Sequence, residues 1–197
     1  IFLLGFVGRL RAEKNVRLLV DLEKRLLDAG KTNFKFLIVG EGNEREYLES
    51  NLKNAEFTGF LEGEALSEAY ANMDIFVFPS ETDAFGNVAQ EACASGVPPI
   101  VTDKGGPKFI IEDGKSGFIA TNPDDFFKYS SRLMDERELL ARMSSEAVKR
   151  AQASSWDAVF EKVYSAYDEC TRLEAENKLR NTSGKAILQE TNERDYI

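Results

Sequence analysis

The feature that most constrains the fold is an alternation of short apolar runs with longer segments of helical period. The short runs are rich in β-branched and aromatic residues, which favour strands, and the segments between them repeat their apolar residues every three or four positions. Strands are predicted at Phe2 to Val7, Phe36 to Val39, Glu56 to Thr58, Ile75 to Phe78 and Pro99 to Val101, with a short one near Phe118. This alternation is typical of βαβ units, so we expect an α/β domain with a doubly wound parallel sheet flanked by helices in three layers.

The segments between the strands predict the helices. Before the second strand, apolar residues at i, i+3, i+4 spacing form one helical face, and Gly30 stands where a left-handed helix end is expected. That face consists of Val16, Leu19, Val20, Leu26 and Leu27. Further helices are predicted at Asn87 to Ser95, Asp124 to Met134 and Glu136 to Ala151, and a last one behind Ser154, where Asp157 completes a capping pair.

The last predicted helix carries an apolar stripe that needs a surface to dock on. Its members are Trp156, Val159, Phe160, Val163, Tyr164 and Tyr167. Beyond Thr171 the chain is poor in apolar residues and is interrupted by Asn181 to Gly184. We therefore expect a domain of residues 1–170 and a tail, residues 171–197, that is a frayed helix or disordered.

Composition removes several classes of function. The net charge of −9 disfavours nucleic acid as a partner, and the absence of histidine excludes histidine-based catalysis and imidazole metal ligands. Two cysteines cannot form a metal cluster, and Cys93 is expected to be a free buried thiol, which fits a reducing, cytoplasmic compartment. No apolar run is long enough to span a bilayer. The start at Ile1, directly inside a strand, indicates a piece of a longer chain.

In a doubly wound sheet the ligand lies beyond the carboxyl ends of the strands, so the loops that follow each strand hold the candidate site residues. After the first strand, Gly8 permits close approach, and Arg9 and Lys14 are suited to binding a diphosphate. The alternative is that these are solvated cations on a loop before a helix. After the second strand, Gly40 and Gly42 permit a tight turn and close approach to a planar ligand; the alternative, which this element taken alone favours, is an ordinary turn.

The loop after the fourth strand is the richest in candidate residues. Asp83 leaves the sheet, Gly86 and Asn87 open a helix whose free amides attract phosphate or sugar hydroxyls, and Glu91 lies one turn inside that helix. Both carboxylates can then face one cleft. The alternative for Asp83 is a turn residue that caps this helix. A fourth loop, from Asp103 to Lys108, adds two glycines and two cations.

Taken together, these loops resemble the donor-binding half of a group 1, or family 4, glycosyltransferase of GT-B fold. The resemblance covers about residues 1–170 in the correct order. It rests on Val7 to Leu10 with Glu13 to Asn15, Val39 to Gly42, Phe57 to Phe60, Pro79 and Ser80, Asp83 to Glu91, Ala94 to Pro98, Gly105 and Gly106, and Ser155 to Asp157. It implies a Rossmann-like domain that binds a nucleotide sugar such as a UDP- or GDP-sugar, with no further cofactor.

The resemblance also implies a role for each site residue. Arg9 and Lys14 would clasp the diphosphate, and Glu91, the second acid of the family's E-x7-E motif, would bind ribose hydroxyls. The main-chain amides of Phe85, Gly86 and Asn87 would meet the donor sugar and phosphate, and the base would lie against the backbone near Gly40 and the turn at Phe57. The first acid of the motif is usually glutamate. Here it is Asp83, which is one methylene shorter, so its sugar contact is open.

The implied reaction is a transfer that retains the anomeric configuration, with the departing diphosphate helping to deprotonate the acceptor. Asp83, Arg9 and Lys14 would be the catalytic residues, and no acidic pair forms a recognisable metal site. The acceptor would bind an N-terminal domain absent from this chain, and the isolated domain would be inactive. Peripheral membrane contact through that domain stays open. The alternatives are a nucleotide-sugar-binding module without catalysis, or another GT-B reaction such as nucleotide-sugar epimerisation.

Overall fold

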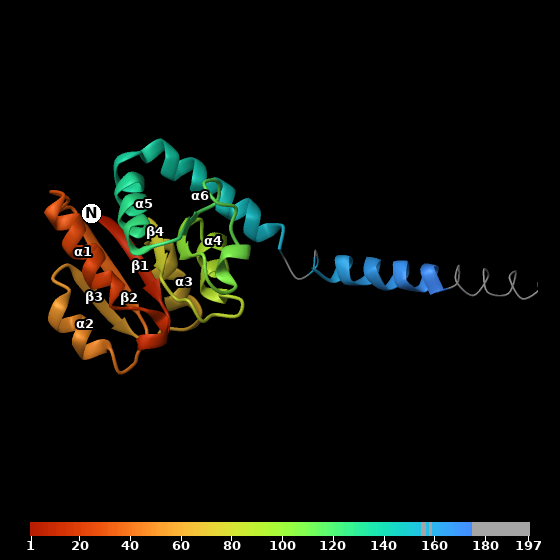
Figure 1. The fold of residues 1–197 in the computed structure, drawn as a ribbon, viewed down its shortest axis with the longest axis horizontal. Coiled ribbons are helices and arrows are strands. Elements are labelled where there is room, and N and C mark those ends of the chain that lie inside the picture. Colours follow the sequence, from red (N-terminus) through yellow and green to blue (C-terminus); the bar gives the residue numbers. More distant parts are fainter. Residues whose placement is uncertain (155–156, 158, 175–197) are drawn as a thin grey trace, which may run out of the picture. The chain divides into compact units, whose positions relative to one another are not determined.

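The computed structural model describes residues 1–154, 157 and 159–174. Its centre is a six-stranded sheet in the order β3-β2-β1-β4-β5-β6, and all five strand pairs are parallel (Figure 1). The strands are β1 (Phe2–Val7), β2 (Phe34–Val39), β3 (Ala55–Gly59), β4 (Ile75–Phe78), β5 (Pro99–Thr102) and β6 (Phe118–Ala120). The expected Rossmann-like α/β architecture is confirmed.

Two strands, β1 and β4, begin and end at the predicted residues. All four residues of β4 are buried, because helices cover both faces of a parallel sheet and leave no solvent-exposed side. The strands at the centre are therefore continuous apolar runs, which is the pattern most easily found in a sequence. The edge strand β3 alternates between exposed and half-buried positions, and only part of it was predicted.

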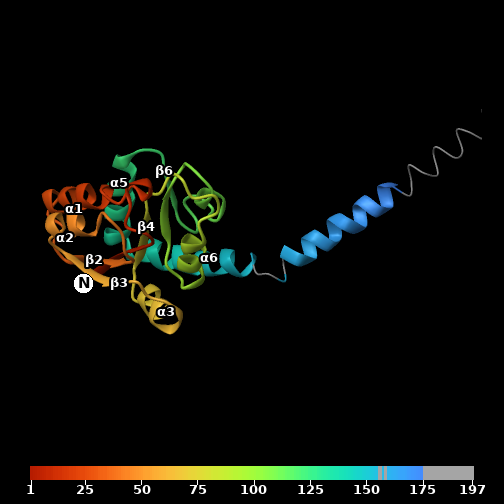
Figure 2. The ribbon, with the colours of Figure 1, turned by 90° about the horizontal axis from the view of Figure 1, so that it is seen from below.

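The helices form two layers on the sheet. They are α1 (Leu18–Asp28), α2 (Arg45–Asn51), α3 (Gly63–Ala71), α4 (Asn87–Ala94), α5 (Pro123–Asp135) and α6 (Arg137–Gln152), with short 3-10 turns η1 (Ala12–Lys14) and η2 (Pro107–Phe109). The helix α1 packs beside α5, and α4 packs beside α6. Figure 2 shows α1 and α5 on one side of the sheet and α3 and α6 on the other.

The predicted ends of α4, α5 and α6 lie within one residue of the observed ends. At the end of α1, Gly30 has the expected left-handed conformation, with φ +76°. The helices α2 and α3 were not predicted. They are short and bury few side chains: Leu48 in α2, and Ala69 and Tyr70 in α3. So few buried positions cannot establish a helical period.

The expected buried thiol is confirmed: Cys93 lies in the core on α4, whereas Cys170 is exposed. Burial raises the pKa of the Cys93 thiol to about 12. At pH 8 only about one Cys93 in ten thousand is then a thiolate, which is the reactive form. We expect a disulfide reagent to titrate one thiol per folded chain at pH 8 and two per chain in denaturant. Two fast-reacting thiols in the folded chain would contradict this placement.

By internal contacts the chain divides into two units, Ile1–Ala153 and Ser154–Ile197. In the second unit residues 159–174 are helical, so the predicted boundary between residues 170 and 171 falls inside a helix. The stripe residues Val159, Phe160, Val163, Tyr164 and Tyr167 are between 39% and 67% exposed. The remaining member, Trp156, and the tail beyond residue 174 lie outside the described residues.

Candidate functional site

The strand order reverses between β1 and β4. The chain runs outward from β1 to β2 and β3, and then returns to place β4 on the other side of β1. In parallel α/β sheets this reversal opens a crevice at the carboxyl edge, where ligands bind. The loops after β1, β2, β4 and β5 meet at this edge. They contain all the predicted site residues except Phe57, which is on β3, and Asn87 and Glu91, which belong to α4.

Backbone contacts hold the loops after β1 and β2 together. The Gly8 amide donates to the Val39 carbonyl at 3.0 Å, and the Leu10 amide donates to the Glu41 carbonyl at 2.9 Å. A Cβ atom at Gly40 would lie 1.9 Å from the Gly8 carbonyl oxygen, so only glycine fits there. Loop packing therefore explains Gly40 without any ligand. Its contact with a base stays a prediction.

The two predicted phosphate-binding cations differ in their surroundings. The side chain of Arg9 is 63% exposed and lies 3.7 Å from Glu13, a geometry that contributes little stability in water. Lys14, at the end of η1, is buried. Arg9 is thus accessible to an anion, whereas Lys14 is already held by the protein.

Lys14 is held by Asp83. Its Nζ atom donates to Asp83 Oδ1 at 2.7 Å and to Oδ2 at 2.8 Å, and the two side chains are only 10% and 20% exposed. Two residues that were predicted to be catalytic from separate loops are therefore in direct contact. The capping alternative for Asp83 finds no support, because the N-cap of α4 is Gly86 and accepts no side-chain cap bond. An ammonium group has three N–H donors, so Lys14 retains one for a ligand.

The start of α4 is fixed by the loop after β5. The Gly106 amide donates to the Asp83 carbonyl at 2.7 Å. Gly86 has φ +89°, and a Cβ atom there would lie 2.6 Å from Cγ of Pro107. The fourth loop of the sequence analysis, Asp103 to Lys108, thus supports the segment that carries Asp83. Phe85 is 59% exposed at this edge, and the first amides of α4 follow it.

The second motif acid, Glu91, is exposed on α4 and accepts a hydrogen bond from Tyr70 at 2.9 Å. Tyr70 was not among the predicted site residues. No pattern in the sequence marks Tyr70 as a site residue, because it lies on α3, a helix that was not predicted, 21 residues before Glu91.

At the edge of the sheet, Phe57 is half-buried under the Arg45 guanidinium, and Phe60 is 72% exposed.

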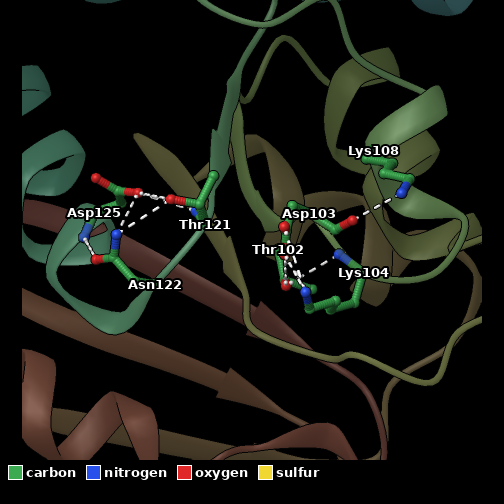
Figure 3. Close-up of polar contacts among 7 residues, drawn as sticks. All are labelled: Thr102, Asp103, Lys104, Lys108, Thr121, Asn122 and Asp125. Carbon is green, nitrogen blue, oxygen red and sulfur yellow. Dashed lines mark hydrogen bonds and ion pairs between the residues drawn. The ribbon is translucent and has the colours of Figure 1, made fainter.

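A hollow of about 80 Å³ lies beside this site, at the ends of β5 and β6. Figure 3 shows Thr102, Asp103 and Lys104 on one side and Thr121 and Asn122 on the other. The Asn122 side chain caps α5 by accepting from the Asp125 amide at 3.1 Å. Hydrogen bonds from Thr121 hold the pKa of the Asp125 carboxyl below its usual value. The polar groups of Thr121, Asn122 and Asp125 thus satisfy the start of α5 and are explained by it.

Among residues 1–154, 157 and 159–174, no group of three or more Asp, Glu, Cys or His side chains is placed to hold a metal ion. Within the same part of the chain, no helix is both long and apolar enough to cross a membrane.

With this geometry in place, comparison with known proteins identifies the family. A family model described as glycosyl transferases group 1 matches residues 2–150. The chain belongs to this family. Its relatives include a GDP-mannose-dependent alpha-mannosyltransferase of Corynebacterium glutamicum, 38% identical over 171 residues that cover 87% of this chain and 38% of that protein. A sulfoquinovosyl transferase of Arabidopsis thaliana is 35% identical over 165 residues, covering 80% of this chain and 31% of the relative.

The fold comparison agrees with this membership. The crystal structure of the pneumococcal O-GlcNAc transferase GtfA, in complex with UDP and GlcNAc, superposes with a TM-score of 0.70 and 24% identity, covering 85% of this chain and 35% of that one. At this identity the likeness concerns the fold alone. The chain spans less than half the length of these relatives.

Proposed function

We propose that this chain is the donor-binding domain of a retaining glycosyltransferase that moves a hexose-type sugar from a nucleotide sugar to an acceptor. The observation that carries the proposal is the meeting of Lys14, Asp83 and the start of α4 at the carboxyl edge, within a member of this family. A lysine ammonium, the accessible Arg9 and free helix amides form an anion site suited to a diphosphate.

The donor proposed for the first test is GDP-mannose. Three of the relatives are GDP-mannose-dependent mannosyltransferases, with 36% to 44% identity to this chain. A GDP-sugar and a UDP-sugar share the ribose and the diphosphate, for which Glu91, Arg9 and Lys14 are the proposed partners. The base and the sugar would be selected elsewhere, by the backbone near Gly40 and the exposed edge around Phe85.

In the proposed reaction, the bond between the anomeric carbon and the diphosphate oxygen breaks while an acceptor oxygen bonds to the same face of the sugar. The acceptor proton passes to the departing diphosphate. Arg9, Lys14 and the amides of α4 stabilise the negative charge that develops on this leaving group, without a metal ion. Asp83 lies beside Lys14 and would hold the ammonium toward the phosphates, in addition to acting near the anomeric carbon.

The proposal includes a partner domain and a location. The acceptor would bind the N-terminal part of the longer protein, so residues 1–197 alone should bind donor and transfer no sugar. The enzyme would work in the cytoplasm. A non-catalytic binding module remains the alternative, and transfer by the whole protein distinguishes the two.

A thermal-shift panel in EDTA tests the proposal. The chain is heated with GDP-mannose, GDP-glucose, UDP-glucose and ADP-glucose, and with mannose alone as the control. A ligand at one hundred times its dissociation constant adds about 2.7 kcal/mol to the free energy of unfolding, which raises Tm by about 5–10 °C in a chain of this size. We expect a shift with at least one nucleotide sugar. No shift with any of them, or a shift only with added divalent metal, would contradict the proposed site.

A further inference from the structure

Tyr70, which has no role in the proposed function so far, contacts Glu91, the acid proposed to bind the ribose. Tyr70 lies near the end of α3, and its side chain is buried, with 2% of the residue exposed. Its hydroxyl donates to Glu91 Oε2 at 2.9 Å and approaches the Val88 carbonyl oxygen at 3.2 Å. Both partners belong to α4, so a single buried hydroxyl connects the two helices at the position of Glu91.

The tyrosine is fixed in place and stays protonated. Its ring packs against Phe76 of β4, with the ring centroids 5.9 Å apart at an interplanar angle of 57°. Burial, followed by the nearby Glu91 carboxylate, raises the pKa of Tyr70 above its ordinary value. The phenol therefore remains a hydrogen-bond donor throughout the physiological range, aimed from a rigid support.

Burial of the tyrosine does not by itself explain the contact with Glu91. The Val88 carbonyl alone would satisfy the buried hydroxyl, since a phenol has one proton to donate. Glu91 is exposed, and an exposed glutamate without such a bond samples several rotamers. The hydrogen bond from Tyr70 therefore restrains a side chain that packing alone does not hold. A restrained carboxylate at a binding edge is the arrangement expected of a supported ligand contact.

We propose that Tyr70 is a positioning residue that holds the Glu91 carboxylate ready for the two ribose hydroxyls of the donor nucleotide. The inference rests on the proposed function and assigns a new role within the same site. A carboxylate has two oxygens with about four lone-pair positions, so one bond from Tyr70 leaves it able to accept both ribose hydroxyls. Fixing the carboxylate beforehand reduces the loss of side-chain freedom on binding.

The test compares ribose with a sugar that lacks both hydroxyls. Calorimetry on residues 1–197 gives the dissociation constants of GDP and UDP and of their 2′,3′-dideoxy counterparts. The preference for ribose is the ratio of the two constants for one base. We expect the wild-type chain to prefer ribose by about 10- to 100-fold, the range for charged hydrogen bonds. Tyr70→Phe should reduce this preference about two- to tenfold by weakening only the ribose form.

Three variants complete the experiment. Glu91→Gln should remove most of the preference, and adding Tyr70→Phe to it should change the ratio no further, because the tyrosine acts through Glu91. Tyr129→Phe is the control. Tyr129 is on α5 and its ring stacks on Phe118, so removing its hydroxyl should leave the ratio unchanged. If Tyr70→Phe weakens both nucleotides equally, or lowers Tm and leaves the ratio unchanged, Tyr70 only supports the fold and the inference is overturned. If the wild-type chain binds neither GDP nor UDP, the proposed function itself fails.

Discussion

Replacing Lys14 with methionine is expected to lower the free energy of unfolding by about 2–4 kcal/mol, or Tm by about 5–15 °C. Methionine keeps most of the apolar length of lysine and removes the ammonium. The Asp83 carboxylate, with a side chain only 20% exposed, then loses the group that donates to both of its oxygens. Removing one partner of a fully buried pair costs about 3–5 kcal/mol, and slight exposure reduces that figure.

Lys35→Met is the matched control for this prediction. Lys35 pairs with Glu56 at 3.1 Å, but the two side chains are 43% and 61% exposed, so its loss should cost less than about 1 kcal/mol. Adding Asp83→Asn to Lys14→Met removes the unpaired charge and should recover part of the lost stability. Equal losses for Lys14→Met and Lys35→Met, measured by urea denaturation, would show that the Lys14 pair is no stronger than an exposed one.

The second large effect is expected at Gly40. Gly40→Ala should lower the free energy of unfolding by about 2–6 kcal/mol, the sum of backbone strain and overpacking. The residue has φ +134°, and the new Cβ atom would lie 1.9 Å from a backbone oxygen that cannot rotate away. Because small domains are stable by only about 5–15 kcal/mol, the variant should melt far below the wild-type chain or accumulate poorly.

Gly30→Ala separates the two causes. Gly30 also has positive φ, +76°, but a Cβ atom there would meet nothing within 4 Å. Its replacement should cost only the left-handed conformation, about 1–2 kcal/mol. A loss at Gly40 no larger than the loss at Gly30 would mean that the loops after β1 and β2 separate without penalty, and that their contact does not shape the site.

The sequence predicts the fold well where burial is continuous. The central strands β1 and β4 are apolar on both faces, and their ends coincide with the predicted ones. The amphipathic helices α5 and α6 have long polar and apolar faces and are also predicted to within one residue. The helices α2 and α3 were not predicted, because each buries at most two side chains. Tertiary packing defines these helices, and no local pattern in the sequence encodes it.

The candidate site is predicted less completely, for a similar reason. The sequence shows that the loops contain the types of residue needed to bind a diphosphate and a ribose. It does not show which of these residues contact one another. Lys14 and Asp83 are 69 residues apart and meet only in the folded sheet, and Tyr70 reaches Glu91 from a different helix. The structure shows that Gly40 and Gly106 each make room for a neighbouring loop, and the contact of Gly40 with a ligand stays a prediction.

Amide hydrogen exchange can locate the donor on the protein. Amide hydrogen exchange of residues 1–197 is measured in EDTA with and without saturating GDP-mannose, or with whichever nucleotide sugar gives the largest thermal shift. A donor at the carboxyl edge should slow exchange in residues 8–15 and 84–91. It should leave residues 29–33 and 71–74, at the amino edge of the sheet, unchanged. Protection at the amino edge, with no change in residues 8–15 and 84–91, would contradict the assignment of this edge as the donor site.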